Sequence, residues 1–208
     1  MKKTDRTRKL AAPVSSKDHV RGSPLAKVTL VGYGDFTCPD CAKAYRTVKK
    51  IQAEMGSRLR YVFRSFPQNS RDEKSENAAE AAESAGAQGK FWEIHDRLFE
   101  NKGPSNQFQL AKDAKDVGLD EGQFRRDMQG HVHLARVRAV REGGVRSGVV
   151  QVPTFFINSL KHESAFGLAT LLPAVQAAAG LDDSTVKTKR RTETKRQTER
   201  VARKVAHA

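Results

Sequence analysis

Two cysteines are the residues of this chain whose type and spacing point most directly to chemistry. They are the only cysteines among the 208 residues, and they stand together in the segment Cys38-Pro39-Asp40-Cys41. Two thiols separated by two residues at a helix start can come close enough to form a disulfide. An apolar run at residues 28–31 precedes the pair, and a helix-like stretch follows it. The spacing therefore predicts a dithiol that can open and close a disulfide on itself.

The two thiols are expected to differ, because only Cys38 lies at the start of the predicted helix. Exposed backbone amides of a first helical turn stabilise a thiolate, and such positions can lower a cysteine pKa from about 8.5 into the range of roughly 3.5–7.5. We therefore predict that Cys38 is the nucleophile. Cys41, one turn further along and less exposed, is predicted to resolve the mixed disulfide.

Two residues just before the first cysteine are further candidates. Asp35 could carry a proton to or from Cys41, or its side chain could cap the helix start or form a turn. Phe36 is expected to fill the core or the rim of the active site. Both are therefore counted among the residues that modulate the dithiol.

Other uses of the cysteine pair stay open. In a zinc site the pair would supply two of four ligands, and His131 and His133 form the available histidine pair. In a structural role the pair would form an unreactive disulfide, although so short a loop removes little chain entropy. The order of strand, CxxC and helix favours redox chemistry, and we expect neither a metal nor an organic cofactor.

Length and charge limit the number of domains and indicate where the chain can be ordered. With 38% hydrophobic residues, the chain can bury one good core with appendages. The formal charge is +14, and residues 1–22 and 182–208 each hold a surplus of five positive charges. We predict a flexible basic arm at residues 1–24 and a disordered or marginally helical basic tail at residues 181–208. These ends could make weak electrostatic contacts with acidic partners or nucleic acid.

Membrane and export signals are not visible in the sequence. No run approaches the roughly 18–20 apolar residues of a membrane span, and no apolar segment of a signal peptide follows the first residues. The expected location is therefore cytoplasmic, where cysteines rest mostly reduced. A periplasmic or secreted location would apply if the start of the chain is misassigned.

Hydrophobic periodicity predicts an alternation of strands and helices. Residues 28–33 and 59–66 are predicted strands, and an amphipathic helix lies between them and ends at Gly56. Residues 73–142 are predicted to form several short helices separated by glycine breaks. The Gly143-Gly144 pair is interpreted as a break before a strand at residues 149–158. A last amphipathic helix is predicted at residues 168–179.

This order of elements and its motifs resemble the DsbA-like branch of the thioredoxin superfamily. The resemblance covers about residues 13–178. It implies an α/β thioredoxin fold at residues 25–180 with an inserted all-helical lobe at about residues 73–142. The motifs that carry it are VTLVGYGDFTCPDCAKAY at residues 28–45, the pairs Phe91-Trp92 and Ile94-His95, and VPTFFIN at residues 152–158.

The resemblance also implies a second part of the site. In the family a cis peptide precedes the proline that corresponds to Pro153, and this loop faces the dithiol. The main chain at the position of Val152 binds extended substrate segments. An ordinary trans proline that opens a strand is the alternative.

The residues between the cysteines depart from the family pattern. Strongly oxidising members carry a histidine there, whereas this chain has Pro39 and Asp40. A carboxylate beside Cys38 opposes the formation of its thiolate, because nearby negative charge raises a thiol pKa. A stabilised thiolate is what makes a dithiol a strong oxidant. We therefore expect a less oxidising couple, closer to a reductase or an isomerase.

The predicted function is that of a thiol–disulfide oxidoreductase. Cys38 would form a mixed disulfide with protein or low-molecular-weight thiols, and Cys41 would resolve it. One alternative is a redox-sensing binding protein whose basic arms engage an acidic partner. Another is a glutathione-using transferase or isomerase of the same superfamily, although these relatives typically lack the second cysteine.

Overall fold

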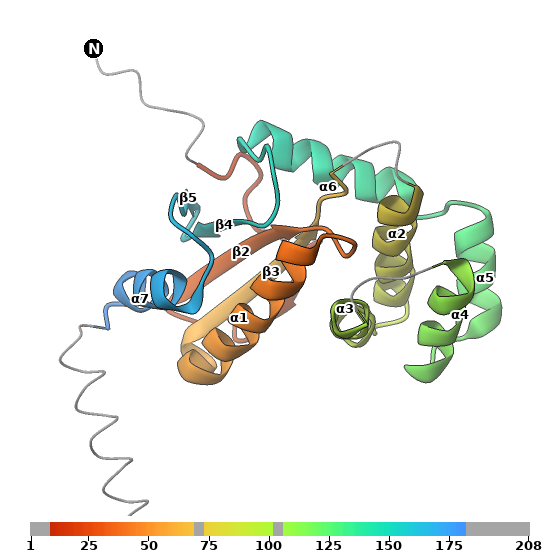
Figure 1. The fold of residues 1–208 in the computed structure, drawn as a ribbon, viewed down its shortest axis with the longest axis horizontal. Coiled ribbons are helices and arrows are strands. Elements are labelled where there is room, and N and C mark those ends of the chain that lie inside the picture. The colour runs from red at the N-terminus through yellow and green to blue at the C-terminus, as the bar shows by residue number, and fades with distance from the viewer. Residues whose placement is uncertain (1–8, 69–72, 102–105, 182–208) are drawn as a thin grey trace, which may run out of the picture.

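A mixed five-stranded sheet forms the centre of the protein, with strand order β1-β3-β2-β4-β5 (Figure 1). The computed structural model describes residues 9–68, 73–101 and 106–181. β2 pairs with β3 in parallel, whereas the β1–β3, β2–β4 and β4–β5 pairs are antiparallel. The strands are β1 (His19–Arg21), β2 (Val28–Gly34), β3 (Leu59–Ser65), β4 (Thr154–Ile157) and β5 (Leu160–Lys161).

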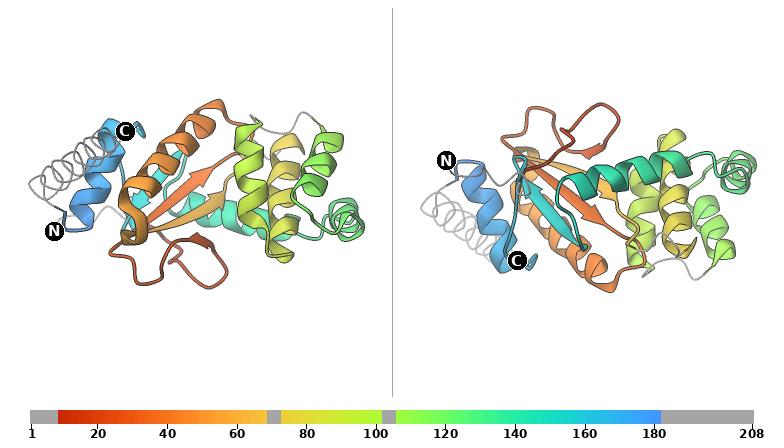
Figure 2. Two further views of the ribbon diagram at one scale, coloured as in Figure 1. Left: turned by 90° about the horizontal axis from the view of Figure 1, so that it is seen from below. Right: turned by 90° about the horizontal axis from the view of Figure 1, so that it is seen from above.

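Helices cover both faces of this sheet and extend it to one side. α1 and α6 lie on opposite faces, while α2, α4 and α5 stack beside the sheet and α7 lies at its other end (Figure 2). Among the described residues, no helix is long and apolar enough to cross a membrane. The helices are α1 (Pro39–Met55), the short 3-10 helix η2 (Gly56–Arg58), α2 (Glu73–Ala87), α3 (Phe91–Glu100), α4 (Gln107–Asp116), α5 (Glu121–Gln129), α6 (Leu134–Arg146) and α7 (Leu168–Ala178).

β2 is a thoroughly covered strand, because it has neighbours on both edges and helices on both faces. Six of its seven residues are buried. A strand in such a position loses the alternation of apolar and polar residues. This explains why the sequence of β2 shows a continuous apolar run.

The Gly143-Gly144 pair lies inside α6, so the prediction of a break at this point is wrong. A Cβ atom on Gly144 would lie 2.8 Å from two ring atoms of Phe66 and 2.9 Å from the ring of Tyr33. Glycine therefore lets α6 approach the sheet. The local preference of glycine against helix is outweighed by this packing.

The first described residues are held against the sheet, so the prediction of a flexible arm at residues 1–24 is wrong for residues 9–24. β1 pairs with β3, and Leu10 is buried. The buried guanidinium of Arg64 donates to both carboxylate oxygens of Asp18, at 2.7 and 3.0 Å, and to the carbonyl of Ala12 at 2.9 Å. Composition alone misses this anchor, because the partner charge lies 46 residues away. Residues 1–8 and 182–208, which include most of the predicted tail, lie outside the described residues.

The two neighbouring glycines of α6 are expected to respond oppositely to alanine. Gly144→Ala should lower the free energy of unfolding by about 1–3 kcal/mol, because its Cβ would overlap buried rings. Gly143→Ala should raise it by up to about 1 kcal/mol through helix propensity, since its Cβ would lie 3.7 Å from Ala12, an ordinary contact. Urea unfolding of both variants measures the two effects. Equal effects of the two substitutions would contradict the packing explanation.

Candidate active site

The dithiol is formed where α1 begins. Cys38 is the residue before the first helical turn, with extended backbone angles, and its Sγ accepts the backbone N–H of Cys41 at 3.4 Å. Pro39 occupies the first helical position, where a missing N–H costs nothing. Both features are local, so the sequence is sufficient to place the first sulfur at the helix N-terminus.

The two cysteines differ strongly in exposure. Both are free thiols; Cys38 is partly exposed and Cys41 is buried. Burial raises the pKa of the Cys41 thiol far above its ordinary value, and a hydrogen bond from the backbone N–H of Asp35 at 3.4 Å opposes this only in part. A reagent in solution therefore meets Cys38 first, while Cys41 stays protonated behind it.

Residues from the far end of the chain face the exposed sulfur. The Sγ of Cys38 lies 3.8 Å from the carbonyl oxygen of Val152. The Val152–Pro153 peptide bond is cis in the structure, and Pro153 lines the same small cavity as Cys41. The fold thus brings these two predicted residues to the dithiol across more than 100 residues of sequence.

Asp35 forms a turn and does not cap the helix. Its Oδ1 accepts hydrogen bonds from the backbone N–H and the hydroxyl of Thr37, both at 2.9 Å. Its Oδ2 accepts the backbone N–H of Gln68 at 3.1 Å and the hydroxyl of Ser75. The carboxylate is therefore committed to four donors. The pattern Asp-x-Thr before the cysteines indicates such a turn, whereas nothing in the sequence identifies Gln68 or Ser75 as its partners.

Asp40 points to solvent rather than into the site. Its side chain is about half exposed, and one carboxylate oxygen lies 2.8 Å from the Nζ of Lys43. The negative charge predicted beside Cys38 is thus partly offset by a lysine on the same helix face. The sequence contains this pair at the i and i+3 spacing that permits it.

Phe36 belongs to an aromatic cluster beneath the dithiol rather than to its rim. Its ring is buried and packs 4.9 Å from the ring of Phe99 and 5.3 Å from that of Phe63, between centroids. His95 of α3 also lies in this cluster, 4.6 Å from the centroid of Phe63. The Nδ1 of His95 lies 2.9 Å from Asp96, but burial among these rings lowers the pKa of His95 to about 4.

The histidines proposed for a zinc site have other partners. His131 lies 2.9 Å from the carboxylate of Glu80, and His133 lies 3.3 Å from that of Asp127. No group of three or more histidine, cysteine or acidic side chains suited to a metal ion occurs in the described ranges. The zinc alternative therefore lacks a second pair of ligands at the cysteines.

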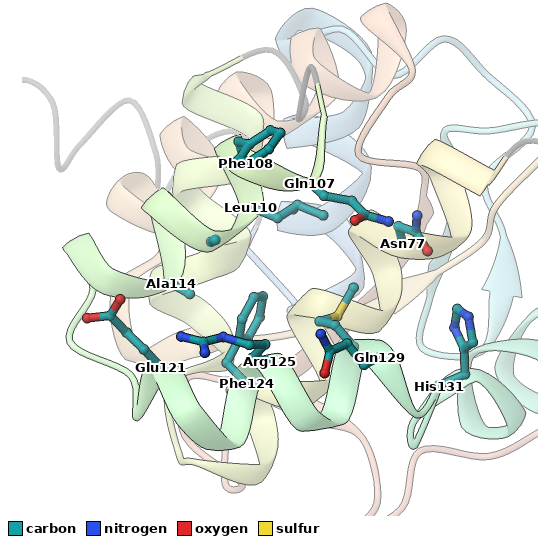
Figure 3. Close-up of a pocket in the computed structure, with 12 residues that line it drawn as sticks. Asn77, Gln107, Phe108, Leu110, Ala114, Glu121, Phe124, Arg125, Gln129 and His131 are labelled. Atoms are coloured by element: carbon teal, nitrogen blue, oxygen red, sulfur yellow. The ribbon is translucent and has the colours of Figure 1, made fainter.

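A larger hollow lies in the helical lobe, apart from the dithiol (Figure 3). It has a volume of about 430 Å³ and is lined by residues of α2, α4 and α5, with Leu110, Phe124 and Met128 among its apolar side chains. Neither cysteine lines it. This hollow is therefore separate from the dithiol site.

Comparison with known proteins decides the family. A family model described as thioredoxin matches residues 14–177. This chain belongs to the thioredoxin family. The predicted α/β thioredoxin fold with its helical insertion, and the resemblance to DsbA-like proteins, are confirmed.

Solved structures agree with this assignment. BdbD from Bacillus subtilis matches with a TM-score of 0.72 and 20% identity, over 83% of this chain and 99% of that one. A thioredoxin-like oxidoreductase from Silicibacter pomeroyi DSS-3 matches with a TM-score of 0.69 and 29% identity, over 79% and 93%. The thiol-disulfide exchange protein alpha-DsbA2 from Wolbachia pipientis matches with a TM-score of 0.67 and 21% identity, over 77% and 86%.

Sequence relatives include much longer proteins. The Na(+)/H(+) antiporter NhaA 1 of Salinispora arenicola is 37% identical over 81% of this chain but only 26% of its own length. NhaA 1 of Mycobacterium sp. (strain KMS) is 36% identical, over 81% and 28%. This chain spans about a quarter of the length of these relatives. Their names describe the longer proteins, so the match carries no transport activity to this chain.

The buried His95 predicts a specific loss of stability in acid. Its pKa is about 4 in the folded protein and 6.5 in a free side chain, so the unfolded chain binds more protons between these values. The free energy of unfolding should therefore fall as the pH drops from about 6.5 to 4, by about 3 kcal/mol. Asp96, with a pKa lowered to about 2, titrates below this window.

Denaturant unfolding of the wild type and of His95→Phe over this pH range tests the assignment. Phenylalanine fits a site formed by aromatic rings and cannot be protonated, so the variant should lose this part of the pH dependence. An equally steep decline in both proteins would show that another group is responsible.

Proposed function

We propose that this protein is a thiol–disulfide oxidoreductase that exchanges its Cys38–Cys41 dithiol or disulfide with protein or low-molecular-weight thiols. The unequal exposure of the two sulfurs carries the proposal. A partly exposed sulfur at a helix N-terminus meets the substrate, and a buried sulfur in the next turn waits to displace it. Membership of the thioredoxin family and the likeness to oxidoreductase structures support this activity.

The reaction follows from these positions in two exchanges. In the reducing direction, the Cys38 thiolate attacks one sulfur of a substrate disulfide and releases the other substrate sulfur as a thiolate. Cys41 then attacks the Cys38 sulfur, closes the Cys38–Cys41 disulfide and releases the second substrate thiolate. The substrate gains two electrons and two protons, and the dithiol loses them. Oxidation of a substrate dithiol is the same sequence in reverse.

The loop before Pro153 is proposed to hold the substrate. The carbonyl oxygen of Val152 lies beside the Sγ of Cys38, while Val150 and Gln151 next to it are exposed. An extended substrate segment could pair with the main chain here and present its sulfur to Cys38. Recognition through main-chain atoms suits substrates of varied sequence.

Serine substitutions should separate the two steps. Cys38→Ser should abolish the reduction of insulin by dithiothreitol above the uncatalysed rate, because no mixed disulfide can form. Cys41→Ser should also lose turnover, but it should accumulate a mixed disulfide on Cys38, since the resolving sulfur is absent. Mass spectrometry of the intact protein under non-reducing conditions detects this adduct. Activity retained by Cys38→Ser would contradict the proposed nucleophile.

The direction of electron flow should respond to the charge of residue 40. Asp40→His removes a carboxylate near the Cys38 sulfur and should make the pair more oxidising, with a redox potential raised by about 30 mV or more. Lys43→Met removes the cation that offsets Asp40 and should lower the potential. Equilibration of each protein with glutathione measures these shifts. Shifts of the same sign in both variants would contradict the electrostatic explanation.

A further inference from the structure

A small cavity lies beneath the dithiol, between α1 and the sheet. Its volume is about 10 Å³, and Cys41, Tyr61 and Pro153 are among the residues that line it. A volume of about 10–15 Å³ accessible to a probe of water size is enough for one water molecule. The Cys41 sulfur and Tyr61 of β3 thus line the same cavity, which is large enough for one water molecule.

Two glycines of β2 make room for this arrangement. Gly32 and Gly34 lie two residues apart, so they share one face of the strand. A Cβ atom on Gly32 would lie 3.1 Å from the hydroxyl of Tyr61, and one on Gly34 would lie 3.9 Å from the Sγ of Cys41. At these two positions the strand under the dithiol therefore presents no side chain. The ring of Phe155 from β4, 2.9 Å from that Cβ position, and the phenol of Tyr61 from β3 together occupy the space that a side chain at Gly32 would need.

The hydroxyl of Tyr61 is uncommitted, in contrast to the other two tyrosines that line the cavity. The hydroxyl of Tyr45 donates to Glu100 at 2.9 Å, and that of Tyr33 accepts from Arg64 at 2.9 Å. No hydrogen-bond partner for the Tyr61 hydroxyl occurs among the residues that the structure describes, although the residue is only 5% exposed. Its oxygen is not among the fully buried side-chain atoms that lack a partner, so it borders space that a water molecule in the cavity can occupy.

The resolving step requires negative charge on Cys41, and little in its surroundings stabilises that charge. Burial raises the pKa of this thiol. The carboxylate of Asp35 is committed to four donors and does not line the cavity. Among the residues that the structure describes, only the backbone N–H of Asp35 donates to the sulfur. The other charged or titratable groups that bear on Cys41 or Tyr61 are Cys38 and Tyr45 of the α1 region, Arg21 of β1 and Asp96 of α3.

We propose that Tyr61 is a positioning residue for the second exchange. Its hydroxyl, through one water molecule in this cavity, donates a hydrogen bond to the Cys41 sulfur as negative charge develops there. The inference rests on the proposed oxidoreductase function. In the step, Cys41 forms a bond to the Cys38 sulfur, the bond from Cys38 to the substrate sulfur breaks, and the proton of Cys41 ends on the departing substrate thiolate. Tyr61 keeps its own proton throughout.

Stoichiometric oxidation by dithiobis(nitrobenzoate) separates the two exchanges. The first nitrothiobenzoate is released when Cys38 forms a mixed disulfide, and the second when Cys41 displaces the remaining group. Tyr61→Phe should slow the second release by about tenfold, the effect of losing one hydrogen bond to a charged group. The first release should not change. Tyr45→Phe is the matched control, because its hydroxyl is committed to Glu100, and both of its releases should match those of the wild type.

A second measurement distinguishes this role from a structural one. When glutathione reduces the oxidised protein, Cys41 is the leaving thiolate, so Tyr61→Phe should slow this reaction by the same factor. Because the forward and reverse rates fall by the same factor, the equilibrium constant between the protein disulfide and glutathione should stay unchanged. A second release in Tyr61→Phe as fast as in the wild type would overturn the inference, as would a shifted equilibrium. Absence of any second release in the wild type would instead overturn the proposed function, and with it this inference.

Discussion

The buried carboxylate of Asp35 is the interaction on which the geometry of the site depends. It joins the end of β2 to the start of α1 through Thr37, and it also binds Gln68 after β3 and Ser75 in the first turn of α2. Four donors satisfy a charge that would be costly to bury alone. The same turn directs the backbone N–H of Asp35 at the buried sulfur. The helical lobe and the dithiol are therefore fixed by one group.

The helical insertion separates the two halves of the site in sequence but not in space. The Sγ of Cys38 and the carbonyl of Val152 are 114 residues apart along the chain. β4 brings them together, because its antiparallel pairing with β2 places Thr154 opposite Tyr33, at the end of β2 that leads into α1. α6 reaches this point across the opposite face of the sheet, and Gly144 permits its close contact there. The loop before Pro153 is thus positioned by sheet register and helix packing together.

Local features of the site could be predicted from the sequence, and long-range features could not. The helix start at Cys38 follows from Pro39, which acts within the first turn, and from the apolar periodicity along α1. Both signals are local in the sequence. The anchoring of residues 9–24 depends on Arg64 and Asp18, whose side chains meet only after β1 pairs with β3. Positive charge in the first residues indicated a flexible arm, but one buried ion pair and a buried Leu10 outweigh that composition. The helix break predicted at Gly144 is wrong for the same reason, because Gly144 contacts Phe66, which is distant in the sequence.

The two aspartates near the cysteines differ in exposure, and so their negative charges act differently on the two sulfurs. Asp40 is solvated and paired with Lys43, so its field at the Cys38 sulfur is screened. Asp35 is buried, and its carboxylate accepts four hydrogen bonds. Burial raises the pKa of Cys41, and the negative charge of Asp35 raises it further. The buried half of the dithiol depends on neutral donors, one backbone amide and, by our inference, the hydroxyl of Tyr61. A neutral donor stabilises negative charge on the Cys41 sulfur without taking up its proton. The sulfur can therefore act as the nucleophile in one direction of the exchange and as the leaving group in the other.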